Sequence, residues 1–267
     1  MYYPLISSMN KVVPSYLLDT YSGAIVGFDF RKIKTTAIKC IRIRRSSDNT
    51  EMDIGFFGNI IDNSAITIFV GSNSAYVVKW YDQSGNGYDL SQTTAAYQPR
   101  IVNAGTIYTQ NGKVSMEYYG SDKHLVSSYS FSALIPVHAF LTVKNTRDTS
   151  LNPYLLDSSL SRFVIYFQTF ISLYNGLQIT SSYSGSDFNI VTGLFNGTSS
   201  KLRRNGNEIA SGNAGTWGLS GVLYVGCRNN GAQNMDGSYS SLVIYNSDKT
   251  SNQSAIETEI NNYYGIY

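Results

Sequence analysis

The sequence predicts an all-β protein built as one β-sandwich with a few short helices. The chain has 267 residues, among them 22 Tyr and 12 Phe, and aromatic and β-branched residues suit a pleated, half-buried surface. The 23 Gly and several Asn-Gly and Ser-Gly steps supply the turns that many short strands need. The apolar runs are short and separated by turn residues, which favours a sandwich over alternating β/α units.

Strands are predicted where short apolar runs end in polar turns. The clearest hairpin lies at Asn205-Gly206, because Asn-Gly between two strand-like runs is typical of a type I′ turn. Ala24–Ile33 is compatible with a short helix or an irregular strand, and Ala65–Val70 is a further apolar block. The predicted strands are Ile38–Ile43, Ala75–Tyr81, Val114–Tyr119, His138–Lys144, Arg162–Phe170, Phe188–Phe195, Ser200–Arg204 and Val222–Gly226.

The C-terminal segment predicts a last strand followed by a packed helix. Residues Ser238–Tyr245 alternate in polarity, and Ser251–Ser254 offer capping groups to a helix that places Ile256 and Ile260 on one face. Residues 1–21 read as an N-terminal arm, and residues 22–267 as a single sandwich domain, a length that one domain can accommodate.

Charge and cysteine content exclude several classes of function. Twenty basic and 18 acidic side chains give a net charge of +2, which is far from the basic surface of a nucleic-acid-binding protein. No run approaches the roughly 18 apolar residues of a membrane span, and residues 1–11 lack the pattern of a signal peptide. We therefore expect folding in a cytoplasm, with Cys40 and Cys227 as buried thiols.

Four segments carry a resemblance to known proteins: Ile43–Phe56, Trp80–Gly87, Gln98–Asn103 and Leu223–Gly226. They resemble the catalytic sandwich of arabinofuranosidase B-type glycoside hydrolases. The same signature is similar to that of bacteriophage virion proteins with laminin G-like domains, in which it is not tied to hydrolysis. The resemblance implies a concanavalin A-like (laminin G-like jelly-roll) β-sandwich, with one of its short helices at the C-terminus.

The resemblance does not extend to the catalytic carboxylates. A retaining glycosidase uses two carboxyl groups about 5 Å apart. Where the hydrolases have an acid after their matching strand, this sequence has Asn229, and the run matched to their nucleophile strand, Arg162–Gln168, contains no carboxylate. Asp236 lies near in sequence and could substitute for the first of the two acids, but the sequence offers no second carboxyl group to act with it. We expect no catalytic residues and no cofactor.

Charged residues near the N-terminus suggest a structural role. Arg44 and Arg45 are followed by Asp48 and Asp53, and Asp82 begins a Gly-containing loop. We expect these five residues to form paired structural networks, with a phosphate site as the less favoured alternative.

The same loop leaves open a calcium site, because Asp82, Asn86 and Asp89 supply oxygen ligands at short spacing. The loop lacks the acidic density of an established calcium loop, so hydrogen bonding to the backbone is the favoured role of Asp82. His124 and His138 are too far apart in sequence to suggest a metal site.

Carbohydrate binding is the remaining possibility for a site. An aromatic face can stack on the apolar side of a pyranose, and Tyr118, Tyr119 and Tyr183 are candidate platforms. The candidate carbohydrate-binding residues are Trp217, Asn229 and Asp236.

These observations favour a non-enzymatic structural or adhesion protein of a bacteriophage virion, as a capsid decoration, head fibre or tail component. We expect it to assemble in the host cytoplasm with other virion proteins and with copies of itself, without binding nucleic acid or inserting into a membrane. Host surface polysaccharide is a further expected partner. The alternatives are a lectin module outside a virion and an arabinofuranosidase-like hydrolase.

Overall fold

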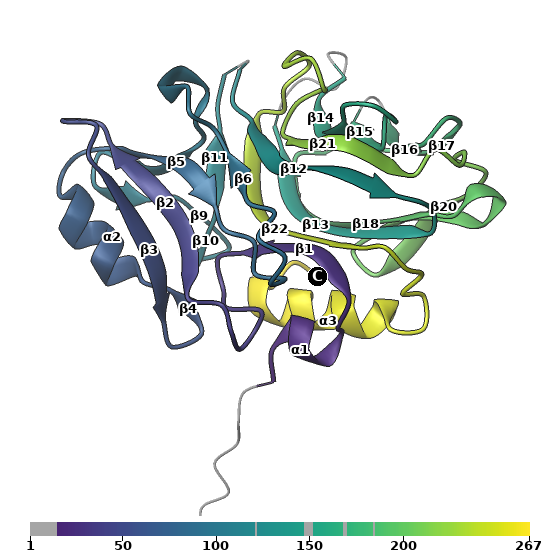
Figure 1. The fold of residues 1–267 in the computed structure, drawn as a ribbon, viewed down its shortest axis with the longest axis horizontal. Helices are drawn as coiled ribbons and strands as arrows, with labels where there is room; N and C mark the ends of the chain where they lie inside the picture. Colours follow the sequence, from purple (N-terminus) through teal and green to yellow (C-terminus); the bar gives the residue numbers. More distant parts are fainter. Residues whose placement is uncertain (1–14, 121, 147–151, 168–169, 184) are drawn as a thin grey trace, which may run out of the picture.

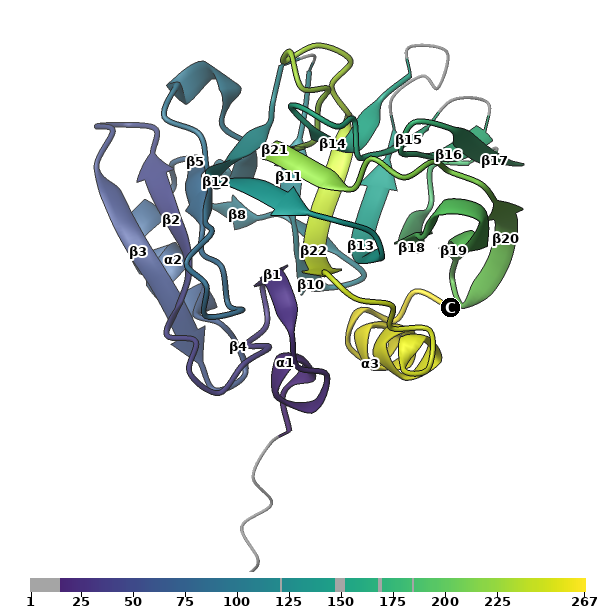
Figure 2. The same ribbon diagram turned by 45° about the vertical axis from the view of Figure 1, so that its right-hand side comes forward.

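A computed structural model describes residues 15–267 except 121, 147–151, 168–169 and 184. Within this range the chain forms two antiparallel sheets packed face to face, with helices against the outer side of one of them (Figures 1 and 2). The predicted all-β sandwich with a C-terminal helix is confirmed. In the described residues no helix has the length and apolar character needed to cross a membrane.

The first sheet has the strand order β17–β16–β15–β14–β21–β12–β6–β5, and every neighbouring pair is antiparallel. Its strands are β5 (Ala75–Trp80), β6 (Leu90–Ser91), β12 (Leu125–Ala133), β14 (Tyr154–Ser158), β15 (Val164–Phe167), β16 (Phe170–Tyr174), β17 (Gln178–Ser182) and β21 (Leu219–Val225).

The second sheet has the order β20–β19–β18–β13–β22–β1, with β11 beside the other end of β22. Its strands are β1 (Ala24–Asp29), β11 (Met116–Tyr118), β13 (Val137–Asn145), β18 (Phe188–Phe195), β19 (Ser200–Arg204), β20 (Asn207–Gly212) and β22 (Gly237–Tyr245). Strand β11 continues through β7 to β5, which joins the two sheets.

The remaining elements extend this framework at the β5 end. Strands β2 and β3 pair beside β5, and a helix lies against β3. These elements are α2 (Asn63–Val70), β2 (Lys39–Arg45), β3 (Glu51–Phe57), β4 (Ile60–Ile61), β7 (Arg100–Asn103), β8 (Thr106–Ile107), β9 (Thr109–Gln110), β10 (Lys113–Val114) and the 3₁₀ turn Ala95–Tyr97. A second 3₁₀ turn, Gly197–Ser199, joins β18 to β19.

The alternation of side chains along the strands creates two hydrophobic layers. Leu156 and Leu173 of the first sheet meet Leu141 and Leu242 of the second in the main core between the sheets. The alternate residues of the second sheet face the other way, as Phe140 does. A strand points successive side chains to opposite faces, so the second sheet is covered on both sides.

Two helices cover the outer face of the second sheet. Helix α3 (Gln253–Tyr264) buries Ile256, Ile260 and Tyr264 there, as the C-terminal sequence predicts for the first two. Helix α1 (Leu17–Thr20) buries Leu17 and Leu18 in the same layer. Residues 15–21 of the predicted arm are thus packed against the sandwich, and residues 1–14 lie outside the described part of the chain.

Several local predictions are confirmed, and others are wrong: the predicted strand Val114–Tyr119 is divided between β10 and β11, and no side chain caps the N-terminus of α3. The Asn205-Gly206 turn joins β19 and β20 with φ angles of 50° and 77°, as a type I′ turn requires. Residues Ala24–Asp29 form β1, which has an irregularity in its pairing between Ala24 and Val26. The predicted strand Arg162–Phe170 is wrong, because β15 ends at Phe167 and an antiparallel β16 begins at Phe170.

The apolar block Ala65–Val70 lies in a helix. The side chain of Asp62 accepts a hydrogen bond from the Ala65 N–H at 2.9 Å and so caps the N-terminus of α2. Only Ile66 and Val70 of this helix are buried, which is the one-sided burial of a surface helix.

A buried carboxylate joins β1 to α3. The Asp29 side chain is fully buried, and Arg31 Nε lies 3.2 Å from its Oδ2. The Tyr264 hydroxyl lies 2.8 Å from Asp29 Oδ1 and 2.8 Å from the Ser240 carbonyl oxygen. Burial raises the pKa of the Asp29 carboxyl, while the Arg31 charge opposes that rise. Burying the Asp29 carboxylate is therefore tolerable only because Arg31 and Tyr264 pair with it.

We expect Tyr264→Phe to lower the free energy of unfolding by about 1–3 kcal/mol, because it removes a hydroxyl and leaves the buried Asp29 carboxylate and the Ser240 carbonyl with one partner fewer. Urea unfolding followed by fluorescence measures the change. The neighbouring Tyr263→Phe is the matched control, since Tyr263 is only partly buried and keeps its ring contacts. Equal stability of the two variants would contradict the role given to the Asp29 network.

Candidate functional site

The outer face of the first sheet carries a row of tyrosines. Because Ile165 and Leu173 point into the core, their strand neighbours Tyr166 and Tyr174 point outward. Tyr154 lies directly opposite Tyr166 in the sheet register. Side chains opposite each other on antiparallel strands share a face, so three strands bring three tyrosines together.

These tyrosines line a pocket of about 230 Å³. We call it the tyrosine pocket, and its lining residues are Tyr154, Arg162, Val164, Tyr166, Tyr174 and Gln178. The rings of Tyr154 and Tyr166 are stacked with centroids 5.1 Å apart. Gln178 Nε2 donates to the Tyr166 hydroxyl at 2.7 Å. Tyr154 is only 7% exposed, so the partly exposed rings of Tyr166 and Tyr174 supply the aromatic surface of the pocket, beside polar groups held in fixed positions.

An ion pair lies beside the tyrosine pocket. Arg162 Nη2 donates to the Tyr154 hydroxyl at 2.9 Å, and its Nε lies 3.3 Å from Asp157 Oδ2. Asp157 is fully buried, and it also accepts from the backbone N–H of Asn229 at 3.0 Å. Burial raises the pKa of the Asp157 carboxyl, although the Asn229 N–H and the Arg162 charge lower it. The pair fixes the position of Arg162.

A second pocket lies on the other side of Asp157. Tyr224 is directly opposite Asp157 in the register of β21 and β14, so it shares the outer face. With Tyr97 and four other residues it lines a pocket of about 390 Å³. We call it the asparagine pocket, and its lining residues are Tyr97, Asp122, His124, Tyr224, Asn230 and Gly231.

The asparagine pocket has an aromatic wall and a polar rim. Tyr97 is 41% exposed, and its ring centroid lies 5.5 Å from that of His124. Burial lowers the pKa of His124, so its neutral form is favoured. The Asp122 carboxylate is in contact with the ammonium group of Lys123.

Two of the three predicted carbohydrate-binding residues lie beside the pockets, and the third does not. Trp217 is 52% exposed, and its ring lies edge-on to Tyr174 at 5.9 Å. The Asn229 amide lies near the carbonyls of Ser158 and Ser159, at 3.4 and 3.3 Å. Trp217 thus borders the tyrosine pocket and Asn229 lies between the two pockets. Asp236 precedes β22 and lines neither pocket.

The tyrosines proposed as stacking platforms are less suitable than Tyr166 and Tyr174 of the tyrosine pocket, which are partly exposed. Tyr118 and Tyr183 are buried, at 0% and 4% exposure, so the expectation that they are exposed platforms is wrong. Tyr119 is partly buried, with the Arg100 guanidinium 4.4 Å from its ring centroid. Sequence reasoning missed Tyr154, Tyr166 and Tyr174, since only their register brings them together.

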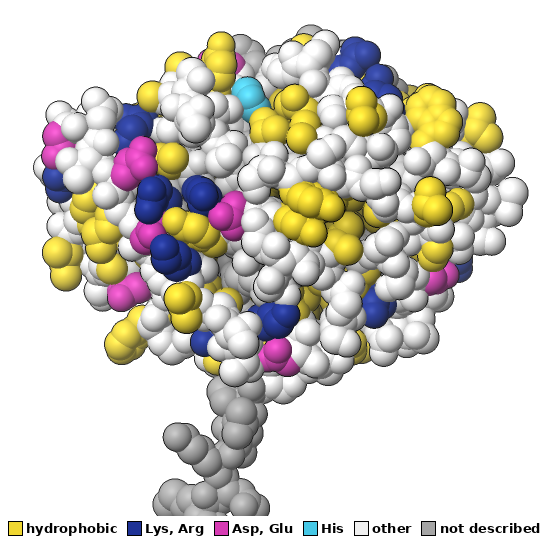
Figure 3. Space-filling view, in the orientation of Figure 1, with side chains coloured by type: hydrophobic (Ala, Val, Ile, Leu, Met, Phe, Trp, Pro, Cys, Tyr) yellow, Lys and Arg dark blue, Asp and Glu magenta, His cyan; other side chains and the backbone are white. Residues whose placement is uncertain are grey.

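The predicted charged network is divided into separate groups. Arg45 pairs with Asp48 at 2.6 Å, and Arg44 donates to Gln98. Asp53 has other partners: it pairs with Arg42 at 2.7 Å and with Lys39 at 2.7 Å. Figure 3 shows acidic and basic side chains interspersed in the region where Figure 1 places β2, β3 and β5.

The Asp82 loop is held by hydrogen bonds from its own surroundings. Asp82 Oδ1 accepts from the backbone N–H of Gly27 at 2.9 Å and of Ser84 at 2.8 Å. Its Oδ2 accepts from the Ser84 hydroxyl at 2.7 Å, and Asp89 pairs with Lys79 at 3.3 Å. The carboxylates proposed for calcium thus have protein partners, and the described residues contain no cluster of three or more His, Cys, Asp or Glu placed to hold a metal.

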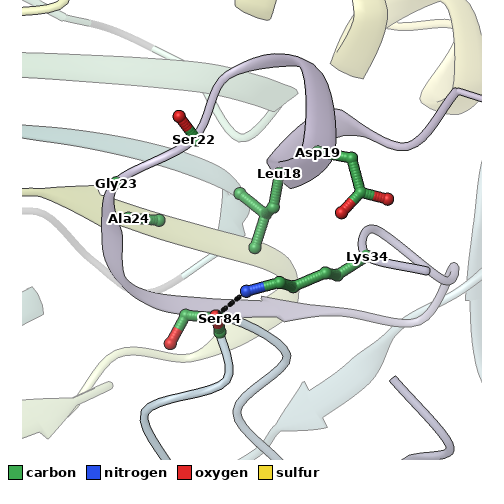
Figure 4. Close-up of a pocket in the computed structure, with 7 residues that line it drawn as sticks. All are labelled: Leu18, Asp19, Ser22, Gly23, Ala24, Lys34 and Ser84. Atoms are coloured by element: carbon green, nitrogen blue, oxygen red, sulfur yellow. Dashed lines mark hydrogen bonds between the residues drawn. The ribbon is translucent and has the colours of Figure 1, made fainter. Parts of the chain in front are cut away.

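A third pocket, of about 240 Å³, lies beside α1 (Figure 4). Lys34 extends across it and donates to the carbonyl oxygen of Ser84, as the dashed line in Figure 4 marks. Asp19 accepts from the Thr35 N–H at 2.9 Å. The charged groups of this third pocket are hydrogen-bonded within the protein, and its lining residues include no aromatic side chain. The third pocket is therefore less suited to a sugar than the tyrosine pocket.

Both cysteines are buried thiols without a disulfide, as the sequence predicts. Burial raises the pKa of the Cys40 and Cys227 thiols. His138 is also buried, which lowers its pKa to about 4. Cys40, Cys227 and His138 are buried inside the protein and line neither the tyrosine pocket nor the asparagine pocket.

Comparison with known proteins supports the fold. No protein-family profile matches the sequence, and no curated protein matches it. Solved structures do match: a mutant GH54 α-L-arabinofuranosidase soaked with 4-nitrophenyl α-L-arabinofuranoside superposes with a TM-score of 0.71 at 13% identity. The enzyme soaked with a cyclic sulfate inhibitor gives 0.69 at 13% identity. An arabinofuranosidase complexed with arabinofuranosyl-α-1,2-xylobiose gives 0.67 at 13% identity.

Each of these alignments covers 91% of this chain and 64% of the enzyme chain. The chain therefore spans less than two thirds of the proteins it resembles. At this identity the similarity establishes the β-sandwich fold, and a shared fold does not transfer an activity.

We expect Asp157→Asn to lower the free energy of unfolding by about 3 kcal/mol, because it leaves the partly buried Arg162 guanidinium without its counter-charge. Thermal or urea unfolding measures the loss. Asp48→Asn is the matched control: it breaks an arginine–aspartate pair on the surface, where ion pairs contribute little. A loss no larger for Asp157→Asn than for the control would contradict a structural role for the buried pair.

Proposed function

We propose that the protein is a non-enzymatic carbohydrate-binding protein whose ligand stacks in the tyrosine pocket. The observation that carries the proposal is the convergence of three tyrosines, an arginine and a glutamine on the outer face of the first sheet. Ligand sites combine apolar or aromatic surface with a few fixed polar groups, and tyrosines provide both an apolar face and a hydroxyl.

The polar groups of the pocket support binding of hydroxylated ligands. Gln178 is held by two contacts, with the Tyr166 hydroxyl at 2.7 Å and the Ser172 hydroxyl at 3.1 Å. Arg162 is positioned by Asp157 and Tyr154. Such positioning reduces the loss of side-chain freedom on binding. The three arabinofuranosidase structures of similar fold are of carbohydrate-active enzymes, one soaked with 4-nitrophenyl α-L-arabinofuranoside and one complexed with arabinofuranosyl-α-1,2-xylobiose.

The arrangement of carboxylates favours binding over hydrolysis. Among the described residues that line the two pockets, Asp122 is the one carboxylate, and it contacts Lys123. The nearby Asp157 is fully buried and paired. Glycoside hydrolysis requires two carboxyl groups on either side of the scissile bond. Gln168, at the end of the run matched to the nucleophile strand, lies outside the described residues.

Purified protein should bind neutral glycans on an array, and Tyr166→Ala should weaken that binding by roughly tenfold, because it removes a stacking surface. Titration calorimetry with the best-bound glycan measures the change. Tyr267→Ala is a matched control, since Tyr267 is exposed and contacts the Asn205-Gly206 turn away from the pocket. Absence of glycan binding would contradict the proposal, and release of nitrophenol from 4-nitrophenyl α-L-arabinofuranoside would contradict its non-enzymatic part.

We also propose, from the sequence resemblance alone, that the protein is displayed on a bacteriophage virion as a structural or adhesion component. In that setting the ligand would be a host surface polysaccharide, and the partners would be other virion proteins and further copies of this chain. Its presence in purified particles, detected by mass spectrometry, is the test. Capsid and tail genes beside its reading frame would support the same placement, and sugar-utilisation genes would oppose it.

A further inference from the structure

We propose that the tyrosine pocket and the asparagine pocket are two subsites of one site for a neutral oligosaccharide long enough to occupy both. This inference rests on the proposed carbohydrate-binding function and specifies its ligand. Its first support is that both pockets open on the same face of the first sheet, as the register pairs Tyr154–Tyr166 and Asp157–Tyr224 place them.

The two pockets are separated by a single group of side chains. Asp157 contacts Arg162, which lines the tyrosine pocket, at 3.3 Å. On its other side Asp157 lies opposite Tyr224, which lines the asparagine pocket. It also accepts from the N–H of Asn229, which immediately precedes the Asn230 of that pocket. One ligand can therefore pass from one pocket to the other over this group.

The strand order gives the length of the site. Tyr224, Tyr154, Tyr166 and Tyr174 lie on β21, β14, β15 and β16, which are consecutive neighbours in the sheet. At about 4.8 Å per strand the row spans roughly 14 Å. Tyr97 adds an exposed ring beyond Tyr224 at one end, and Trp217 adds another beside Tyr174 at the other end. A single sugar ring cannot contact both ends.

The charges in the pockets favour a neutral chain. Arg162 and Asp122 are the charged side chains that line them, and each already contacts an opposite charge, Asp157 or Lys123. Arg228 lies near but lines neither pocket, and it donates to Gln233 at 3.0 Å. The carboxylate of an anionic sugar would have to compete with Asp157 for Arg162, because a guanidinium that is already paired has fewer hydrogen bonds left to donate to a ligand.

The test is titration calorimetry with xylo-, arabino- and manno-oligosaccharides of one to six units, and with oligogalacturonides of the same lengths as the acidic series. We expect affinity for at least one neutral series to increase with length until both pockets are filled. Tyr97→Ala should remove most of this gain, roughly tenfold for the longest chains, and leave the shortest ligands unaffected. Tyr166→Ala should weaken binding at every length.

Phe57→Ala is the control for the loss of an exposed ring, because Phe57 is 78% exposed on β3, outside both pockets. Affinity that is independent of length, or equal effects of Tyr97→Ala on short and long ligands, would overturn the two-subsite inference and leave the proposed function intact. Tighter binding of the acidic series would overturn the neutral specificity. Failure of every series and of the glycan array would overturn the proposed function itself.

Discussion

The rest of the fold depends on one constraint: the backbone N–H and C=O groups of β22 must all find hydrogen-bond partners. All nine residues of β22 are buried, and a buried backbone N–H or C=O without a partner is costly. One edge of the strand is paired with β13 along its length, and the other is shared by β1 and β11. Segments from the beginning, middle and end of the chain therefore meet at this strand in the folded protein.

The sequence predicts the elements whose signal is local. Phe188–Phe195 is found as a strand with the predicted bounds, and the Asn205-Gly206 turn has the backbone angles that its residue types favour. Prediction from the sequence fails where no local signal marks the type or the end of an element. The run Arg162–Phe170 contains no Gly or Pro, so nothing of that kind marks the reversal between β15 and β16. The helix at Asn63–Val70 depends on a cap by Asp62, which a short apolar block does not reveal.

The candidate site is harder to predict, because it is a product of register. The chain has 22 tyrosines, and nothing local distinguishes the partly exposed Tyr166 and Tyr174 from the buried Tyr118, Tyr154 and Tyr183. A shift of one residue in any of these strands would turn a tyrosine into the core. Trp217 and Asn229 were proposed on other grounds, and the structure places both beside the site. The sequence does not single out Asp157, because its importance comes from burial and from its contact with Arg162.

The helices α1 and α3 give the sandwich two unlike sides. They cover the outer face of the second sheet, and the tyrosine row occupies the outer face of the first, so the two sheets separate helices from site (Figure 2). Ser15, the first described residue, also lies on the helical side, where it lines a hollow with Glu259 and Tyr263 of α3. The described N-terminal end and both helices therefore lie on the side of the sandwich opposite the tyrosine row.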